Sequence, residues 1–367
     1  MTTWKTGELG KFITLKRGYD LPQQKRKNGG VPIFSSSGIS GTHDTAMVKA
    51  PGVITGRYGT IGQVFMADED FWPLNTTLYV EDFHGNNPRF IYYFLKTLGW
   101  EKFTSASAVP GINRNTVHKE TICLPDIATQ DKIASILTTL DDKIEINEKI
   151  NDNLYAQAKA IFEQQFIDLE TIPDGWKKGN LLDIANYLNG LAMQKYRPNE
   201  DEVGLPVLKI KELRQGSCDN SSELCSPNIK PEYIIHDGDV IFSWSGSLLV
   251  DIWCGGTCGL NQHLFKVTSN TYDKWFYYLW TAHHLERFIA IAADKATTMG
   301  HIKRGELAKA EVLIPSDEDY KSINSLMNPI FNLIVAKQIE ARKLAELRDE
   351  LLPKLMSGEI DVSEVSL

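Results

Sequence analysis

Apolar residues near the C-terminus recur at helical spacing. Between residues 320 and 362 they follow one another at gaps of three, four and seven, and Lys337 and Arg348 interrupt them. The stripe consists of Ile323, Met327, Ile330, Ile334, Ala341, Leu344 and Leu351. Charged residues crowd the other faces between Glu340 and Glu350. This pattern predicts one long amphipathic helix of the coiled-coil type, which needs a partner for its apolar stripe.

A second stripe lies 190 residues earlier, between residues 130 and 168. Adding 190 to its seven positions reproduces positions of the first region, and six of the seven pairs are apolar in both copies. The polar break at Asn147 also falls on Lys337. We infer an internal duplication and expect the two stripes to form the seam of a helix pair. The expected seam residues are Ile133, Leu137, Leu140, Ile144, Leu154 and Ile161 with Ile323, Met327, Ile330, Ile334, Leu344 and Leu351.

The duplication extends over the rest of the chain. Residues near the N-terminus have identical counterparts 172 positions later, and further matches follow at offsets that grow to 190. The matches include Trp4, Gly7, Leu9 and Gly18 with Trp176, Gly179, Leu181 and Gly190, Asn75 with Asn261, residues 90–93 with 275–278, and Ile112 and Arg114 with Ile302 and Arg304. A drifting offset indicates that loops carry insertions between shared core positions.

Each globular copy contains short apolar runs separated by Gly, Pro, Ser and Asn, a pattern typical of strands and turns. We expect strands at 52–55, 63–66 and 77–80, with counterparts in the second copy. Aromatic-rich segments at 90–98 and 275–283 predict helices that bury their aromatic side chains.

The predicted fold is therefore α/β (α+β) with four parts. Globular domains at 1–128 and 172–318 alternate with helical spacers at 129–171 and 319–367. A helix of about 37 residues spans roughly 55 Å. Two such helices in antiparallel contact would relate the globular domains by a pseudo-twofold axis, which suits a ligand with twofold symmetry such as duplex DNA.

Charge is unevenly distributed along the chain. The net charge is -8, but residues 1–36 hold seven Lys and Arg against two Asp and Glu, whereas residues 129–170 hold nine acidic residues against four Lys. The acidity thus lies partly on the helical segment, and the total does not exclude a nucleic-acid ligand. No run approaches about 20 apolar residues, no signal-peptide pattern opens the chain, and the five cysteines suit a reducing cytoplasm.

Three short runs resemble motifs of a known family. The closing run ELLPKLMSGEI at 350–360, the opening run WKTGELG at 4–10 and the segment GRYGTIG at 56–62 are similar to those of the specificity subunit of type I restriction–modification systems. The likeness covers essentially the whole chain, including its two globular copies and two helical spacers.

The resemblance implies a non-catalytic DNA-binding subunit of a bacterial or archaeal phage-defence system. Each globular domain would read one half of a bipartite double-stranded DNA site, and the helix pair would set the gap. The helices would also dock two methyltransferase subunits, with the run at 351–360 as one docking candidate, and restriction/translocase subunits would join. S-adenosylmethionine, ATP and Mg²⁺ would then belong to the partners, and this chain would need no cofactor, metal or membrane.

Other functions find weaker support in the residues. The chain has no G-x-x-x-x-G-K-[ST] phosphate loop and no Asn/Asp-Pro-Pro-Tyr/Phe methyltransferase motif. Asp126, Asp141 and Lys143 match a loose nuclease pattern, but the last two fall on polar faces of the predicted helix. Cys218, Cys225, Cys254 and Cys258 have spacings that match structural zinc sites poorly. A two-domain scaffold or ligand-binding protein on a helical stalk is the alternative.

DNA contacts are expected from loop residues that can hold phosphates or read base edges. In the first copy these are Lys25, Arg26, Ser36, Ser37, Arg57, Tyr58, Thr60, Ser107, Asn113 and Arg114. In the second they are Lys209, Lys211, Ser243, Trp244, Ser245, Gln262, His263, Thr298, His301, Lys303 and Arg304. Arg114 and Arg304 coincide, which favours phosphate binding or a role in the fold. Arg57 and Trp244 differ, which favours a role in sequence choice.

Overall fold

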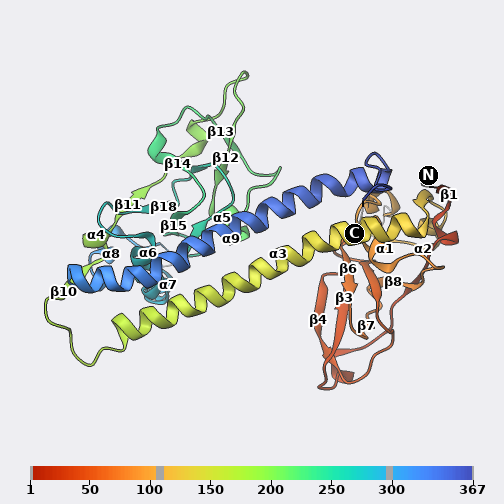
Figure 1. Cartoon of the computed structure of the whole chain (residues 1–367), viewed down its shortest axis with the longest axis horizontal. Coiled ribbons are helices and arrows are strands. Elements are labelled where there is room, and N and C mark those ends of the chain that lie inside the picture. The colour runs from red at the N-terminus through yellow and green to blue at the C-terminus, as the bar shows by residue number, and fades with distance from the viewer. Residues whose placement is uncertain (1–2, 105–110, 295–300, 366–367) are drawn as a thin grey trace. The chain divides into compact units, whose positions relative to one another are not determined.

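The computed structural model of the chain describes residues 3–104, 111–294 and 301–365 (Figure 1). The chain divides into two compact units. Unit 1 comprises residues 1–142 and 345–367, and unit 2 comprises residues 143–344. The globular part of unit 1 is called the first repeat and that of unit 2 the second repeat.

Unit 1 contains the first repeat and one end of each of two long helices. Its elements are β1 (Trp4–Glu8), η1 (Leu9–Lys11), β2 (Thr14–Arg17), η2 (Gln23–Lys25), β3 (Val31–Ser35), β4 (Gly38–His43), β5 (Gly52–Gly56), β6 (Val64–Ala67), β7 (Trp72–Pro73), β8 (Thr77–Asp82), α1 (Pro88–Lys96), η3 (Trp100–Phe103), α2 (Arg114–His118), β9 (Thr121–Pro125) and the first part of α3 (Ile127–Phe162). The strands form an antiparallel pair β1-β9, a four-stranded antiparallel sheet β2-β8-β5-β6 and a smaller sheet β4-β3-β7, in which β3 and β7 are parallel.

Unit 2 repeats this plan. After α3 come the π-helical turn η4 (Glu163–Ile167), β10 (Lys177–Asn180), α4 (Leu181–Ile184), β11 (Asn186–Asn189), η5 (Met193–Lys195), β12 (Leu205–Leu208), α5 (Ile210–Gln215), β13 (Leu224–Cys225), η6 (Pro231–Tyr233), β14 (Ile234–Ile235), β15 (Asp239–Ser243), β16 (Leu249–Trp253), β17 (Cys258–Leu260), β18 (Leu264–Thr268), α6 (Lys274–His283), α7 (Leu285–Asp294), α8 (Arg304–Leu307), β19 (Glu311–Ile314) and α9 (Asp317–Ser357). The pair β10-β19, the sheet β11-β18-β15-β16 and the parallel strands β12 and β17 have the connectivity of their counterparts in unit 1. The shared topology confirms the duplication inferred from sequence.

Backbone contacts define the correspondence between the repeats. A Cβ on Gly18 would lie 2.2 Å from the carbonyl oxygen of Leu74, and a Cβ on Gly190 would lie 2.2 Å from that of Asn261. Both positions therefore require glycine, because any side chain would collide with the backbone. This contact also makes Asn261 the counterpart of Leu74, and the sequence pairing of Asn75 with Asn261 is wrong by one residue.

The neighbouring hydrogen bonds agree with this register. The N–H of Asn75 donates to the carbonyl of Tyr19 at 2.9 Å, and the N–H of Gln262 donates to that of Leu191 at 2.8 Å. Asn75 thus corresponds to Gln262. The Leu-Asn dipeptides at 74–75 and 260–261 are thus shifted by one residue relative to the structural alignment of the repeats. Only the backbone hydrogen bonds show this shift.

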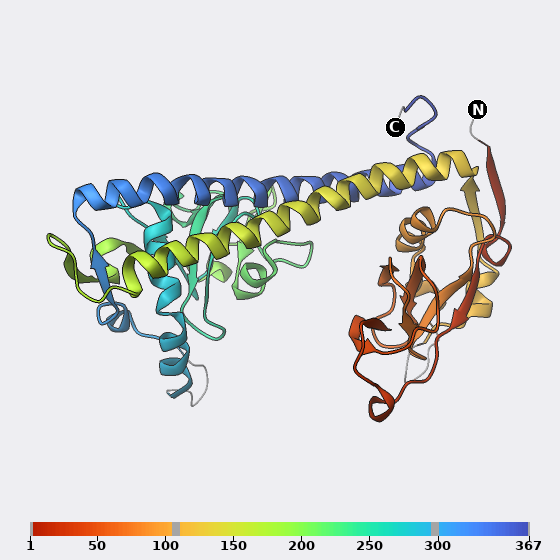
Figure 2. The same cartoon turned by 60° about the horizontal axis from the view of Figure 1, so that its bottom comes forward.

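The long helices pair in opposite directions within each unit, as Figures 1 and 2 show for α3 and α9. In unit 1, Asp141 and Arg348 form an ion pair at 2.7 Å, and the Nζ of Lys132 donates to the carbonyl of Ser363 at 2.6 Å. Residues nearer the start of α3 thus contact residues nearer the C-terminus of the chain, as in an antiparallel pair. Unit 2 shows the same order in the ion pair Lys143–Glu340 at 3.6 Å and the aromatic contact Tyr155–Phe331 at 6.3 Å.

The apolar stripes also belong to the globular cores. Ile133 and Leu137 are buried in the core of unit 1, and Ile323 and Met327 in that of unit 2. Ile334 is buried, whereas the other expected seam residues are partly buried: Leu140, Ile144, Leu154, Ile161, Ile330, Leu344 and Leu351. Part of each stripe therefore packs in a globular core. The assignment of these residues to the helix seam stays a prediction.

The C-terminal run lies mainly in the core of unit 1. Leu355 and Met356 are buried there, and Leu351, Leu352 and Ile360 pack against the same cluster. This run is therefore a poor docking surface, since most of its apolar side chains already have partners within the chain. Among the described helices, none is both long and apolar enough to cross a membrane.

Candidate nucleic-acid interface

Three segments of the first repeat meet beside the loop that follows β5. The N–H of Arg57 donates to the carbonyl of Thr76 at 2.8 Å, just before β8. The N–H of Ile112 donates to the carbonyl of Arg57 at 3.0 Å, and Tyr58 forms an isolated bridge with Gly111. This backbone frame brings together side chains from segments that lie up to 55 residues apart.

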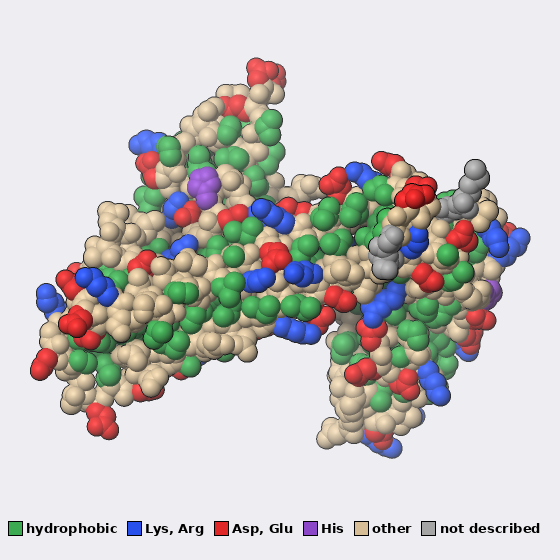
Figure 3. Space-filling model, viewed as in Figure 1, with side chains coloured by type: hydrophobic (Ala, Val, Ile, Leu, Met, Phe, Trp, Pro, Cys, Tyr) green, Lys and Arg blue, Asp and Glu red, His purple; other side chains and the backbone are tan. Residues whose placement is uncertain are grey.

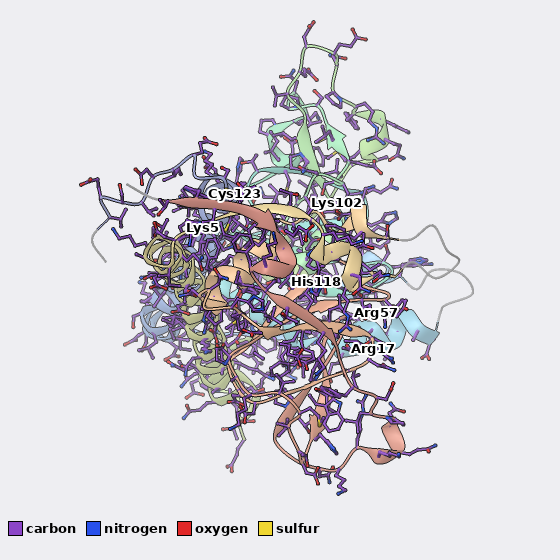
Figure 4. All side chains as sticks on the ribbon, turned by 90° about the vertical axis from the view of Figure 1, so that its right-hand side faces the viewer. Lys5, Arg17, Arg57, Lys102, His118 and Cys123 are labelled. Atoms are coloured by element: carbon purple, nitrogen blue, oxygen red, sulfur yellow. The ribbon has the colours of Figure 1, made fainter. Side chains whose placement is uncertain are left out.

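The Arg57 guanidinium is held in a defined position. Its Nε–H donates to the carbonyl of Ile112 at 3.3 Å, and its Cζ lies 4.6 Å from the centre of the Tyr58 ring. A cation over an aromatic face is stabilised by the ring quadrupole. Figure 4 shows Arg57 and Arg17 on the same side of the domain. Arg17 is not among the DNA-contact residues expected from the sequence.

The loop folds back over the β3–β4 turn. A Cβ on Gly56 would lie 2.0 Å from the carbonyl oxygen of Thr60 and 3.1 Å from the Cβ of Ser36. Ser36 and Thr60 are thus neighbours of Arg57, and the glycine spacing at 56–62 permits the tight loop. It does not form a nucleotide-binding turn, because β6 rather than a helix follows it.

Other candidates of the first repeat have structural partners. Asn113 caps α2 through its Oδ1, which accepts the N–H of Asn115 at 3.0 Å. Arg26 donates to the carbonyl of Ser40 at 3.0 Å. Ser37 hydrogen-bonds to Ser35 at 3.1 Å. Lys25 is exposed in η2, Arg114 is the first residue of α2, and Ser107 lies outside the described residues.

The second repeat gathers polar and aromatic side chains in the equivalent place. The hydroxyl of Ser245 and Nδ1 of His263 are joined by a hydrogen bond of 3.0 Å, and Nε2 of His263 lies 3.3 Å from Nε2 of Gln262. The Trp244 ring lies 6.0 Å from the ring of His263 and 6.2 Å from that of His301. Five candidate residues thus form one cluster.

The frame around Trp244 matches that around Arg57. The N–H of Trp244 is bonded to the carbonyl of His263 at 3.4 Å, and its carbonyl accepts the N–H of Ile302 at 3.1 Å. Ser245 forms a bridge with His301, as Tyr58 does with its partner. The side chain of Trp244 donates its Nε1–H to the Oδ1 of Asn189 at 2.8 Å.

Several candidates of the second repeat are less suited to DNA contact. Ser243 is fully buried and its hydroxyl donates to the carbonyl of Ser245 at 3.2 Å, so its assignment as a surface contact is corrected. Lys209 pairs with Glu223, and Lys211 lies 3.5 Å from Asp219, so both cations are partly neutralised.

Three further candidates lie near or beyond the cluster. Arg304 donates to the carbonyl of Tyr187 at 3.3 Å, which ties it to β11. Lys303 is exposed at the start of α8. Thr298 lies outside the described residues.

Sequence reasoning missed Asn189 of β11, which accepts the Nε1–H of Trp244, and the residue at the equivalent position of β2. Gly18 and Gly190 are equivalent, so the residues before them, Arg17 and Asn189, are equivalent too. The signal was present in the constant offset of 172 between these glycines. The position of Asn189 beside Trp244 depends on strand pairing, which the offset alone does not reveal.

The residues of the nuclease pattern have structural roles. The Oδ2 of Asp126 accepts the N–H of Thr3 at 3.0 Å and its Oδ1 accepts the N–H of Thr129 at 3.0 Å, and these bonds hold the pKa of Asp126 well below its usual range. Asp141 accepts hydrogen bonds from Arg348 and from the hydroxyl of Tyr93. The described residues contain no group of three His, Cys, Asp or Glu that could hold a metal.

Comparison with known proteins assigns the chain to a family. It matches the family described as "Type I restriction modification DNA specificity domain" over residues 1–156 and 173–348, once for each repeat. The chain belongs to this family. As a specificity subunit it is the non-catalytic component of a type I restriction–modification system.

Individual relatives agree with this assignment. The MjaIX specificity subunit of Methanocaldococcus jannaschii is 27% identical over 305 residues, which are 75% of this chain and 70% of the relative. The HindI specificity subunit of Haemophilus influenzae is 21% identical over 74% of this chain and 77% of the relative. The crystal structure of a type I S subunit from M. genitalium shares the fold, with a TM-score of 0.64, 17% identity and 96% coverage of each chain.

Proposed function

We propose that this specificity subunit reads a bipartite double-stranded DNA site, one half with each repeat. The supporting observation is the pair of equivalent clusters around Arg57 and Trp244, where one backbone frame carries different side chains. A shared frame with exchanged side chains suits two readers of different sequences, because base edges are distinguished by the donors and acceptors presented to them.

We further propose that residues 1–128 and 172–318 are the two recognition domains, and that the helical segments at 129–171 and 319–367 set the gap between half-sites. The helices α3 and α9 support this assignment, since each is continuous and contributes to both units. Apolar side chains remain exposed on them, with exposed fractions of 51% for Ile146, 58% for Leu326 and 43% for Leu333.

These exposed side chains support docking of two methyltransferase subunits on the helices. Ile146 also lines a shallow groove of about 310 Å³ with Ile150 and Leu154. Figure 3 shows basic and acidic side chains interspersed along the helices, a surface that presents no single charge to a partner. Restriction/translocase subunits would join the methyltransferases. These partner subunits together would supply the sites for S-adenosylmethionine, ATP and Mg²⁺, and the complex would act in the cytoplasm.

A direct test is to co-express the chain with its cognate methyltransferase in a host that lacks adenine methylation. Sequencing of the modified bases should reveal one motif made of two short specified halves separated by an unspecified gap. The methyltransferase expressed without this chain is the control and should give no such motif. Adenine methylation that is absent or random in the presence of both subunits would contradict the proposed function.

A further inference from the structure

Arg57 and Trp244 occupy the same position in the two repeats but offer different chemistry. In each repeat the residue lies directly after a central strand, β5 or β15, and is held by two equivalent backbone hydrogen bonds. Neither side chain is fully buried. The difference between them therefore changes what the repeat presents at its surface and leaves the backbone frame unchanged.

The guanidinium of Arg57 presents a rigid pair of donors. One of its nitrogens is used by the carbonyl of Ile112, and the ring of Tyr58 lies against its face. The two terminal amino groups have no hydrogen-bond partner among the residues that the structure describes. A planar fork of this kind matches the O6 and N7 acceptors of guanine in the major groove. Its prior immobilisation lowers the entropy lost on binding.

Trp244 presents no such donor. The indole has a single N–H, which already donates to Asn189 at 2.8 Å. The ring lies against Phe265, with centroids 5.8 Å apart, and one face of the cluster is thus aromatic. Such a ring can contact a thymine methyl group or a sugar, but it cannot distinguish guanine from adenine by a hydrogen bond.

A phosphate-binding role explains Arg57 less well. If a cation bound the DNA backbone in the same way in both repeats, it would be expected at the equivalent position of each. Arg114 and Arg304 meet that condition. Arg57 has an uncharged counterpart. Binding of a phosphate also does not require a guanidinium that is fixed by both a carbonyl and an aromatic ring.

We propose that Arg57 reads a guanine in the half-site bound by the first repeat, and that Trp244 makes the corresponding contact in the second repeat without a hydrogen bond to a base. The inference rests on the proposed function, because it requires the loop after β5 to face the DNA. It assigns the difference between the half-sites to one pair of equivalent positions.

The test uses the full chain co-expressed with its cognate methyltransferase, and genome-wide sequencing of methylated adenine. Arg57→Gln should lower the preference for guanine at one position of one half-site by about ten- to a hundredfold, and the other half-site should be unchanged. Arg57→Lys should keep guanine, since lysine also donates to that base. Lys5→Ala removes an exposed charge on β1, on a different side of the domain in Figure 4, and should leave the motif unaltered.

Several results would overturn the inference while the proposed function stands. These are a bipartite motif with no guanine in either half, an unchanged motif with Arg57→Gln, or a change in both halves. If Arg57→Gln abolishes methylation, Arg57→Lys decides the matter. Recovery of the original motif supports guanine reading, and an assembled Arg57→Lys complex without methylation contradicts it. A wild-type motif that is not bipartite would instead contradict the proposed function.

Discussion

At the scale of single residues, Asp251 is a carboxyl group in an unfavourable place. It lies on the edge strand β16 and accepts a hydrogen bond of 2.8 Å from the N–H of Ile252. Burial raises its pKa from 3.8 to about 6. Neutral pH lies above this pKa, so the folded chain carries the ionised carboxylate there, and burial makes that ionised form costlier than in the unfolded chain.

Replacing Asp251 with Asn should stabilise unit 2 at neutral pH. The unfolded carboxyl ionises near pH 3.8 and the folded one near pH 6, so the penalty on folding grows between these values and is constant above them. Asp251→Asn should raise the free energy of unfolding by roughly 1–3 kcal/mol at pH 7.5 and by little at pH 4. Urea denaturation at both pH values measures the change.

The exposed residue Asp201 provides the matched control, because Asp201→Asn removes the same charge without relieving a buried one. It should shift the urea midpoint little at either pH. A loss of stability for Asp251→Asn at pH 7.5 would show that the carboxylate is needed in the folded state.

Residue-scale reasoning from sequence found much of the candidate interface. Arg57, Trp244 and His263 were identified from residue type and the expected loops, and the structure brings their neighbours together. It did not find Asn189, whose role depends on a partner 55 residues away. It also included Ser243, since the sequence does not show which face of β15 the side chain occupies.

At the scale of elements, Arg348 explains an interruption in the apolar stripe of α9. It forms an ion pair with Asp141 of α3 at 2.7 Å, and the hydroxyl of Tyr93 donates to the same carboxylate at 2.6 Å. In unit 2 the corresponding residues are Ala158 and Phe331, which lie in the apolar core. One helix contact is therefore polar in unit 1 and apolar in unit 2.

Removal of Arg348 should destabilise unit 1. Arg348→Ala would leave a partly buried carboxylate with only the Tyr93 hydroxyl among the described partners, at a cost of about 1–3 kcal/mol in the free energy of unfolding. A thermal or urea unfolding curve checks this. Lys149→Ala breaks an exposed pair with Glu145 within α3 and should cost well under about 1 kcal/mol. Equal losses in the free energy of unfolding for the two substitutions would show that the pair Arg348–Asp141 stabilises unit 1 no more than an exposed ion pair does.

The exposed face of α9 provides a second test at this scale. Leu326 and Leu333 are seven residues apart and so lie on one side of the helix, with exposed fractions of 58% and 43%. Leu333→Asp should weaken binding of the purified methyltransferase at least about tenfold, because a charge would replace an apolar contact. Co-elution in size-exclusion chromatography measures it.

Val203 offers the control for this substitution, since it is 90% exposed in a loop of the second repeat. Val203→Asp should leave methyltransferase binding intact. Undiminished binding by Leu333→Asp would remove this face of α9 from the proposed docking surface.

At the scale of the whole molecule, the helices carry a prediction about DNA spacing. One added helical turn lengthens a helix by about 5.4 Å, which corresponds to one to two base pairs. A four-residue insertion after Leu140, with a matching insertion after Arg348 so that Asp141 and Arg348 stay opposite each other, should lengthen the unspecified gap by that amount. Sequencing of methylated adenines reads the gap directly.

Both half-sites should stay unchanged in this variant, because the recognition loops are not altered. The same number of residues inserted in the exposed loop around Val203 is the control and should leave the gap as it was. Altered half-site sequences, or an unchanged gap in an active complex, would contradict the proposal that the helices set the distance.

The sequence by itself determined the repeated plan of this protein. The stripe spacing predicted helices now found at Ile127–Phe162 and Asp317–Ser357, and the offsets of 172 and 190 predicted two copies of one fold. These features depend on local periodicity and on repeated residue types, which can be read along the chain without knowing any contact.

Tertiary structure alone decided which side chains meet. Backbone hydrogen bonds show that Gln262, not Asn261, is the second repeat's equivalent of Asn75, and strand pairing brings Trp244 to Asn189. Helix pairing joined Arg348 to Asp141, 207 residues earlier in the chain. Such contacts depend on register, and a slip of one residue turns a side chain to the other face of a strand, so residue type alone does not specify them.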